Sequence, residues 1–356
     1  MVIRRLEHFG VKSAVSRITA VIMIVAILII AAVGGYGVLM LSQHSSPANV
    51  NLILDFTPTS YQSIFYYGLD HGIYRQNGIA LTITSGSGSA NAIAAVANGK
   101  ADFGFADTGT LAVAAATSNV SNVRIVAMVL QNSFYTVIYN KANISSPTDL
   151  NGKTMGSFQG NGAQKLFTVF GKLNGVNVSS IKTTYTTPAQ FNELVALGKV
   201  DFIVTGVDNN YTLRPVALQS NIHLGTFFYA DYGVNIYGTA IIASTSMIDN
   251  HPDLVKKFVQ ASMQSLLASV QHPSEAISAM VSHNPQLNST RALGGFEEII
   301  KNCLPQNINS TSNALTLGWI DPQEMVNTVS VVTQGYSISN PPSASSLYTD
   351  QFVQSP

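Results

Sequence analysis

Short apolar runs alternate with helix-forming stretches along most of the chain. Between residues 51 and 129 the order is strand, helix, strand, helix, strand, helix, strand. The expected strands are 51–56, 81–84, 100–106 and 123–129, and the expected helices are 61–71, 90–97 and 111–116. Strands that alternate with helices in this way predict an α/β fold with a parallel sheet covered on both faces.

A second series of the same kind follows, and the two series share a motif. The expected strands are 134–139, 153–157, 181–185, 200–204, 223–228 and 237–243, with helices over 163–173 and from a capping box at 187–190 to 197. Segments 97–106 and 196–205 both contain Gly-Lys-x-Asp-Phe, where a helix ends and a buried strand begins. This repeated motif predicts two lobes of similar plan.

The last third of the chain has helical spacing. Apolar residues recur at intervals of three and four over 252–270, which predicts an amphipathic helix. Further helices are expected over 274–282, 293–301 and 319–332. The tail 340–356 is rich in Pro and Ser, and we expect it to be extended.

The N-terminal region has the pattern of a membrane anchor. Residues 18–41 contain no charged residue and are long enough to span a bilayer. Four cations and the single acid Glu7 precede this run, so the positive-inside rule predicts a cytoplasmic N-terminus. A cleaved signal peptide is the alternative, although its apolar region would be shorter. We therefore expect a single-pass protein of the cell membrane with its C-terminal domain outside.

Composition excludes several classes of function. Charged residues make up only 10% of the chain, against about 25% in an ordinary soluble domain. The whole chain has 18 basic and 18 acidic residues, and four of the cations and one of the acids precede the anchor. The remaining 14 basic and 17 acidic residues give no electrostatic reason to expect nucleic-acid binding. Cys303 is the single cysteine, and the histidines lack metal-ligand spacing. No metal or cofactor is expected.

Acidic and aromatic residues gather in the turns where expected strands end. The acids are Asp55, Asp107, Asp208 and Asp231. Each carboxylate either caps its turn or accepts a hydrogen bond from a ligand N–H. The aromatic residues least easily explained by packing are Tyr61, Phe158, Tyr211 and Tyr232.

These turns predict a small-molecule site. In an open α/β sheet, ligands bind beside the carboxyl ends of the strands, and a flat heteroaromatic ring would stack on the aromatic residues there. Basic residues are scarce in these turns, with Lys165 and Arg214 as the exceptions, which weighs against a strongly anionic ligand. The chain has neither a Gly-x-Ser-x-Gly elbow nor a phosphate loop, so no catalytic residue is proposed.

The order and spacing of several segments resemble solute-binding proteins of ABC importers. The segments are 54–58, Gly72-Ile73-Tyr74, Asn77-Gly78, 99–104, 150–153 and 230–234. The resemblance covers about 51–332 and is strongest to the group that binds thiamine-pyrimidine precursors, whose relatives take up nitrate, taurine and aliphatic sulfonates.

That resemblance implies a type II periplasmic-binding-protein fold, with two α/β lobes joined by a hinge. The implied parts are a cytoplasmic segment 1–17, an anchor 18–41, a linker 42–49, lobe one over 50–135 and 241–335, lobe two over 136–240, and a tail 336–356. The anchor would hold the protein in the membrane beside a permease and its ATPase. The function implied is capture and delivery of a ligand, without bond chemistry.

The expected ligand is a small heteroaromatic molecule that resembles the thiamine pyrimidine. The expected binding residues are Asp55, Thr57, Thr59, Tyr61, Gln62, Ser85, Ser87, Asp107, Thr108, Phe158, Gln159, Asn161, Thr205, Asp208, Asp231 and Tyr232. The alternatives are a taurine, sulfonate or nitrate binder of the same family, a pyrimidine-synthesising enzyme of the same fold, and a surface sensor or adhesin. The enzyme would need a cysteine-rich motif, which this chain lacks.

Overall fold

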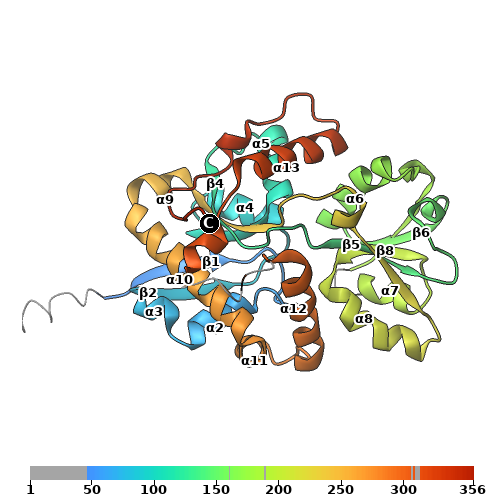
Figure 1. Cartoon of the computed structure of the whole chain (residues 1–356), viewed down its shortest axis with the longest axis horizontal. Coiled ribbons are helices and arrows are strands. Elements are labelled where there is room, and N and C mark those ends of the chain that lie inside the picture. Colours follow the sequence, from blue (N-terminus) through green and yellow to red (C-terminus); the bar gives the residue numbers. More distant parts are fainter. Residues whose placement is uncertain (1–45, 160, 188–189, 306–307, 309–312) are drawn as a thin grey trace, which may run out of the picture. The chain divides into compact units, whose positions relative to one another are not determined.

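Two five-stranded sheets form the framework of the part of the chain that the structure describes. The structure is a computed structural model that describes residues 46–159, 161–187, 190–305, 308 and 313–356. The first sheet has the order β2-β1-β3-β10-β4 and the second the order β7-β6-β8-β5-β9 (Figure 1). The first sheet consists of β1 (Ala48–Ile53), β2 (Ile79–Thr84), β3 (Phe103–Asp107), β4 (Val123–Met128) and β10 (Thr239–Ser244). The second consists of β5 (Tyr135–Asn140), β6 (Thr154–Ser157), β7 (Lys182–Tyr185), β8 (Phe202–Gly206) and β9 (Leu224–Phe228).

The two sheets follow one plan. In the first, β1 is parallel to β2 and β3, whereas β10 is antiparallel to β3 and β4. In the second, β6 is parallel to β7 and β8, whereas β5 is antiparallel to β8 and β9. The antiparallel strand of each sheet is the one that the chain enters after crossing from the other sheet. The prediction of an α/β fold is confirmed, and the expected parallel sheet is corrected to two mixed sheets.

The Gly-Lys-x-Asp-Phe motif has the same structural role in both sheets. Gly99 and Gly198 both have a φ of 66°, a left-handed value that ends the preceding helix. The carboxylates of Asp102 and Asp201 then accept a backbone N–H of the neighbouring strand, β1 or β6, at 2.8 Å in each case. The motif therefore joins the third strand of each sheet to its parallel neighbour.

Helices connect the strands. Before β5 they are α2 (Ser63–Asp70), α3 (Ile73–Gln76), α4 (Ser89–Ala97) and α5 (Thr108–Thr117). Between β6 and β9 they are α6 (Gly162–Leu173), α7 (Phe191–Ala196) and α8 (Asp208–Gln219). After β10 they are α9 (Thr245–Asn250), α10 (Pro252–Gln271), α11 (Pro273–His283), α12 (Ser289–Cys303) and α13 (Pro322–Gly335). Short 3₁₀ helices are η1 (Pro147–Leu150), η2 (Val178–Ser180), η3 (Tyr229–Tyr232), η5 (Ala314–Gly318) and η6 (Ala344–Ser346).

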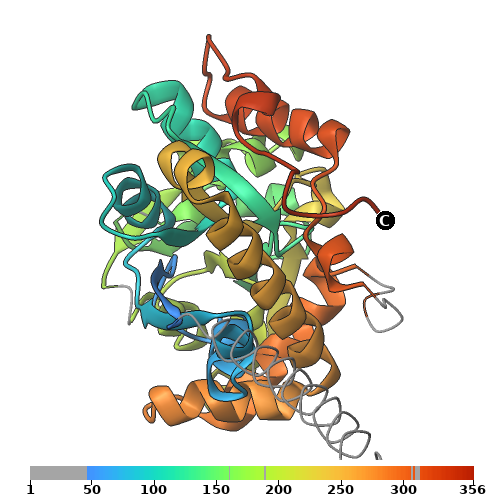
Figure 2. The ribbon, with the colours of Figure 1, turned by 90° about the vertical axis from the view of Figure 1, so that its left-hand side faces the viewer.

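The last helices and the tail complete the core of the first sheet. The long gold helix in Figure 2 is α10, which contacts both α2 and η5. Its Phe258 stacks on Phe103 of β3 with ring centroids 4.0 Å apart. In the tail, Leu347 and Phe352 are buried, and Tyr348 forms a parallel bridge with Ile125 of β4. The expected extended tail is therefore corrected to a packed segment, because it buries apolar side chains.

The N-terminal boundary also differs from the prediction. Strand β1 begins at Ala48, inside the expected linker 42–49, and ends at Ile53, so residues 54–56 belong to the following loop. No helix in the described part of the chain combines the length and the apolar character needed to cross a bilayer. The expected segment 1–17 and anchor 18–41 lie outside the described residues, so the anchor stays a prediction.

Candidate functional site

A cavity of about 320 Å³ lies between loops that follow strands of both sheets. From the first sheet it is lined by the loops after β1 and β2 and by α5. From the second it is lined by the start of β5, the loop after β6, the start of α7 and the junction of β8 with α8. The carboxyl ends of parallel strands therefore meet here, as the site prediction assumed.

Nine of the sixteen expected binding residues line this cavity. They are Asp55, Thr59, Tyr61, Ser87, Phe158, Gln159, Asn161, Thr205 and Asp208. Three others are buried and lie next to lining residues without lining the cavity themselves: Gln62, Asp107 and Thr108. Thr57 and Ser85 are exposed in the loops after β1 and β2.

Asp231 and Tyr232 lie elsewhere. Asp231 is exposed in η3. The Tyr232 ring packs against Phe170 and Phe227, with ring centroids 5.7 and 5.2 Å away. The structure therefore places Tyr232 beside the core of the second sheet rather than in the cavity.

The Asp55 carboxylate is held by two side-chain donors. The Tyr61 hydroxyl donates to Oδ2 at 2.7 Å, and the Gln62 amide donates to Oδ1 at 3.1 Å. The Gln62 carbonyl oxygen in turn accepts the backbone N–H of Thr59 at 3.0 Å. Burial raises the pKa of Asp55 to about 6, even though these hydrogen bonds favour the charged form. The loop after β1 is thus built around an acceptor at the cavity wall.

Asp107 caps helix α5 and positions Thr110, which lines the cavity. Its Oδ1 accepts the backbone N–H of Thr110 at 2.7 Å and the Thr110 hydroxyl at 2.8 Å. Its Oδ2 is buried and has no hydrogen-bond partner within the described part of the chain, and burial raises the pKa of Asp107 to about 6. Thr108 supports the same helix end, since its hydroxyl donates to the Gly238 carbonyl at 2.7 Å.

Helix α4 begins at Ser89, and Gly88 occupies its N-cap position. The Ser89 hydroxyl accepts the backbone N–H of Asp107 at 3.0 Å. Its side chain therefore ties α4 to the end of β3 at the rim of the cavity.

Replacing Asp107 with asparagine should weaken the pH dependence of stability. The pKa of Asp107 is about 6 in the folded protein against 3.8 ordinarily. Because the folded state holds this proton more tightly, the carboxyl stabilises the fold most below about pH 4, and that contribution is lost as the pH rises through 6. Two pKa units correspond to about 3 kcal/mol. The fall in the urea-derived free energy of unfolding from pH 4 to 7 should be smaller in Asp107→Asn by about this amount. The exposed control Asp231→Asn should keep the wild-type slope, and an unchanged slope in Asp107→Asn would contradict the assignment.

Asp208 joins the second sheet to the loop after β1. Its Oδ2 accepts the Ser60 hydroxyl at 3.0 Å and the Thr59 hydroxyl at 3.4 Å. Its Oδ1 faces the side-chain amide of Asn209, and Asn209 also donates to the Thr205 hydroxyl oxygen at 3.1 Å. Burial raises the pKa of Asp208. The carboxylate thus holds hydroxyls and an amide around one edge of the cavity.

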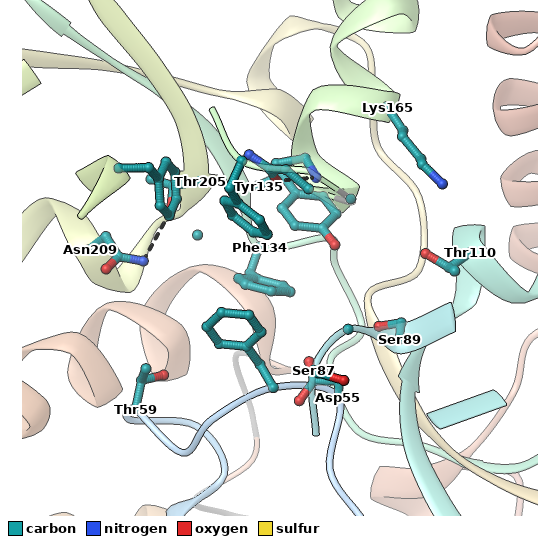
Figure 3. Close-up of a pocket in the computed structure, with 18 of the residues that line it drawn as sticks. Asp55, Thr59, Ser87, Ser89, Thr110, Phe134, Tyr135, Lys165, Thr205 and Asn209 are labelled. Atoms are coloured by element: carbon teal, nitrogen blue, oxygen red, sulfur yellow. Dashed lines mark hydrogen bonds between the residues drawn. The ribbon is translucent and has the colours of Figure 1, made fainter. Parts of the chain in front are cut away.

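The loop after β6 is fixed by Asn161 and brings a cation to the cavity. The Asn161 oxygen caps α6 by accepting the Ala163 N–H at 3.0 Å, and its amide donates to the Val204 carbonyl at 3.0 Å. One turn further along α6, Lys165 lines the cavity and makes no ion pair with the described residues. In the view of Figure 3, Lys165, Thr110 and Ser89 lie on one side and Thr205 and Asn209 on the other.

Aromatic rings from both sheets meet across the cavity. Phe56 of the first and Phe158 of the second have centroids 6.1 Å apart with a 38° tilt. Phe191 packs edge-on against Phe158 at 4.7 Å. Tyr61 and Phe134 form a second pair at 5.0 Å. The cavity therefore has an apolar, aromatic centre between polar edges.

Sequence reasoning missed further lining residues. They are Phe56, Gly88, Ser89, Ala90, Asn91, Thr110, Phe134, Tyr135, Gly162, Ala163, Lys165, Phe191, Asn192, Gly206 and Asn209 among the described residues. Five of them immediately neighbour a predicted residue, so a wider window around each strand end would have found these: Phe56, Gly88, Gly162, Gly206 and Asn209. Arg214, the other basic exception, instead bonds Asn210 through its Nε at 3.2 Å.

The described residues offer little for metal or thiol chemistry. No group of three or more His, Cys, Asp and Glu among them could hold a metal ion. Cys303 is fully buried in α12, outside the set of lining residues, and burial raises the pKa of its thiol. The arrangement is suited to binding a ligand between aromatic rings and hydrogen-bonding groups.

Comparisons with known proteins agree with this fold. The riboflavin-binding protein RibY of Chloroflexus aurantiacus is 23% identical over 317 residues, which cover 85% of this chain and 86% of that protein. The aliphatic sulphonate binding protein SsuA of Escherichia coli superposes with a TM-score of 0.64 at 12% identity, covering 87% of this chain and 95% of that chain. The alkanesulfonate-binding protein SsuA of Xanthomonas axonopodis pv. citri, bound to MOPS, has a TM-score of 0.64 at 16% identity, covering 86% of this chain and all of that chain.

The family itself is given by a sequence match. The pattern that describes the family called NMT1/THI5 like matches residues 59–276, more than half of the 356-residue chain. The resemblance to solute-binding proteins of this group is confirmed, and the protein belongs to the NMT1/THI5-like family.

Proposed function

We propose that this protein is the extracytoplasmic solute-binding component of an ABC importer, and that its ligand is a flat heteroaromatic molecule with a pyrimidine-like ring. The membrane anchor over 18–41 would hold it beside the permease, which the associated ATPase would drive. The observation that carries the proposal is the pair Phe56 and Phe158, which brings one ring from each sheet to the centre of the cavity. Both lobes, 50–135 with 241–335 and 136–240, would then contribute to one site.

The spacing of this pair suggests how a ligand enters. Two rings that enclose a third stand about 7 Å apart, since each stacked contact takes about 3.5 Å. The Phe56 and Phe158 centroids are 6.1 Å apart, so the rings now touch each other. A flat ligand would separate them by about 1 Å, which a small opening between the lobes supplies.

The polar groups favour a ligand that donates hydrogen bonds. Asp55 presents carboxylate oxygens at the cavity wall, and its side chain is nearly fully buried. Ring N–H and amino groups are suitable donors to such acceptors. Lys165 is the cation among the lining residues described. It would donate a hydrogen bond to a hydroxyl or acidic substituent on the side of the cavity that it shares with Thr110.

Two relatives define the alternatives. RibY is named for riboflavin, a larger fused-ring molecule, whereas the cavity of about 320 Å³ lies at the low end of the usual range for ligand sites. The SsuA proteins are named for sulfonates, which would be expected near Lys165. An enzyme of the same fold would need a reactive side chain in the cavity, and Cys303 lies outside its lining.

Calorimetry on wild type and Asp55→Asn tests the ligand class. We expect 4-amino-2-methylpyrimidine to bind and to raise the melting temperature, and taurine to do neither. Losing one charged acceptor should cost on the order of 1.5–3 kcal/mol, about tenfold to a hundredfold in affinity. Asp231→Asn, an exposed carboxylate outside the cavity, is the matched control and should bind as the wild type does.

Three outcomes separate the alternatives. Tight binding of taurine, no binding of the pyrimidine and an intact Asp55→Asn site would overturn the heteroaromatic proposal in favour of a sulfonate. Riboflavin binding far tighter than the pyrimidine would assign a fused ring. Turnover of a bound compound would instead indicate an enzyme.

A further inference from the structure

A chain of side-chain amides runs from a buried carboxylate to a wall of the cavity. The Asn209 amide nitrogen lies 3.4 Å from Asp208 Oδ1 and 3.1 Å from the Thr205 hydroxyl. The Asn192 amide nitrogen donates to Asn209 Oδ1 at 3.0 Å. Asn192, Asn209 and Asp208 all line the cavity.

The carboxylate sets the direction of this chain. A hydroxyl can donate or accept, so Thr205 does not decide which way the Asn209 amide points. An ionised carboxylate oxygen such as Asp208 Oδ1 can only accept, and the hydroxyls of Ser60 and Thr59 donate to the other oxygen, Oδ2. The Asn209 nitrogen therefore faces Asp208, its oxygen faces Asn192, and the Asn192 nitrogen is the donor between the two amides.

This leaves one group at the end of the chain. Asn192 Oδ1 is buried and has no hydrogen-bond partner among the residues that the structure describes. Buried acceptors in native proteins are nearly always paired, and leaving one unpaired is costly. A ligand in the cavity that donates to this oxygen would satisfy it, whereas a ligand that presents another acceptor would meet a repulsive contact.

We propose that Asn192 is a specificity-determining residue that selects ligands with an amino or ring N–H donor. Asp208, acting through Asn209, fixes which end of the Asn192 amide is left for the ligand. This inference rests on the proposed heteroaromatic ligand and assigns a direction to one of its hydrogen bonds. Asp208 is a positioning residue here, since it acts on the ligand through two amides. Rejection of ligands by an unpaired buried group is a strong source of discrimination in binding sites.

Two pyrimidines that differ only in the substituent at position 4 test the polarity. 4-Amino-2-methylpyrimidine carries a donor at position 4, and 4-methoxy-2-methylpyrimidine carries only an acceptor there. With the full-length protein, calorimetry should give the amino compound an affinity about tenfold to a hundredfold higher. Asn192→Leu removes the acceptor, so this ratio should fall to within about threefold of one.

Asp208→Asn provides a second variant that should invert the preference. The Ser60 and Thr59 hydroxyls would keep the new amide oxygen at the Oδ2 position, which turns its nitrogen toward Asn209. Both amides would then reverse, and the Asn192 nitrogen would become the free group. The methoxy compound should now bind at least as tightly as the amino compound. Asn91→Leu is the matched control: Asn91 is another lining amide, bonded to Ser87 and outside the chain, and should keep the wild-type ratio.

The outcomes distinguish this inference from the proposed function. If both rings bind wild type equally, or if Asn192→Leu and Asp208→Asn keep the wild-type ratio while melting as folded proteins, the polarity inference is wrong and the heteroaromatic site stands. If neither ring binds wild type while taurine does, the proposed function fails and the inference falls with it. A collapsed ratio in Asn192→Leu with a retained ratio in Asn91→Leu supports it.

Discussion

Replacing both Phe56 and Phe158 with alanine should lower the affinity for an aromatic ligand on the order of a thousandfold. Stacking of a heteroaromatic base on one aromatic side chain is worth about 1–3 kcal/mol when measured by alanine substitution. Two such rings, one from each sheet, would contribute about 4 kcal/mol together, which corresponds to three orders of magnitude in the dissociation constant. Isothermal titration calorimetry with 4-amino-2-methylpyrimidine measures the change.

Two further variants separate stacking from simple loss of apolar surface. Phe158→Leu keeps apolar bulk but has no π-system, so its affinity should lie between those of wild type and Phe158→Ala. Tyr185→Ala removes an aromatic ring that is 57% exposed on β7, outside the cavity, and should leave affinity unchanged. If the double variant binds within about threefold of wild type, these rings do not enclose the ligand.

The fold was predictable where local pattern and tertiary structure agree. The alternation of strands and helices and the repeated Gly-Lys-x-Asp-Phe motif both follow from local requirements: a left-handed glycine ends a helix, and a carboxylate binds the next strand. The direction of β5 and β10 was not predictable in the same way. An antiparallel strand in a mixed sheet has the same apolar composition as a parallel one, and its direction is decided by where the chain crosses between sheets.

That same feature explains why two of the lining residues were missed. The rule that ligands bind at the carboxyl ends of strands led to Asp55, Asp208 and Thr205. Phe134 and Tyr135 stand at the beginning of β5, and because β5 runs antiparallel to β8, its beginning lies at the edge where β8 ends. A rule that considers only strand ends therefore passes over them.

The misplaced residues have a related cause. Asp231 and Tyr232 follow β9, which is the outermost strand in the order β7-β6-β8-β5-β9. At this edge Tyr232 finds its partners in Phe170 and Phe227. The loop after β2, which is also an edge strand, does reach the cavity, so tertiary packing, which no single segment of sequence encodes, decides which strand-end turns line it.

The loop after β2 contains the glycine whose substitution should destabilise the protein most strongly. A Cβ at Gly86 would overlap the Leu54 carbonyl oxygen and lie 2.7 Å from the Leu54 carbonyl carbon. These atoms are backbone at the end of β1, so they cannot yield by a change of side-chain rotamer. The loop is also held there by the N–H groups of Gly86 and Gly88, which donate to the carbonyls of Phe56 and Asp55 at 3.3 and 2.7 Å.

Gly86→Ala should therefore lower the free energy of unfolding by about 4 kcal/mol. Overpacking costs about 1–3 kcal/mol, and displacing the loop breaks two backbone hydrogen bonds worth about 1 kcal/mol each. Urea unfolding measures the loss, with Ser85→Ala as the control, because Ser85 is exposed in the same loop and its change should stay within about 0.5 kcal/mol. Since this loop carries Ser87 and Ser89 to the cavity and rests on the segment that holds Asp55, ligand affinity should fall in the fraction of Gly86→Ala that stays folded. A Gly86→Ala protein that unfolds at the wild-type urea concentration would mean that the loop does not approach β1 this closely.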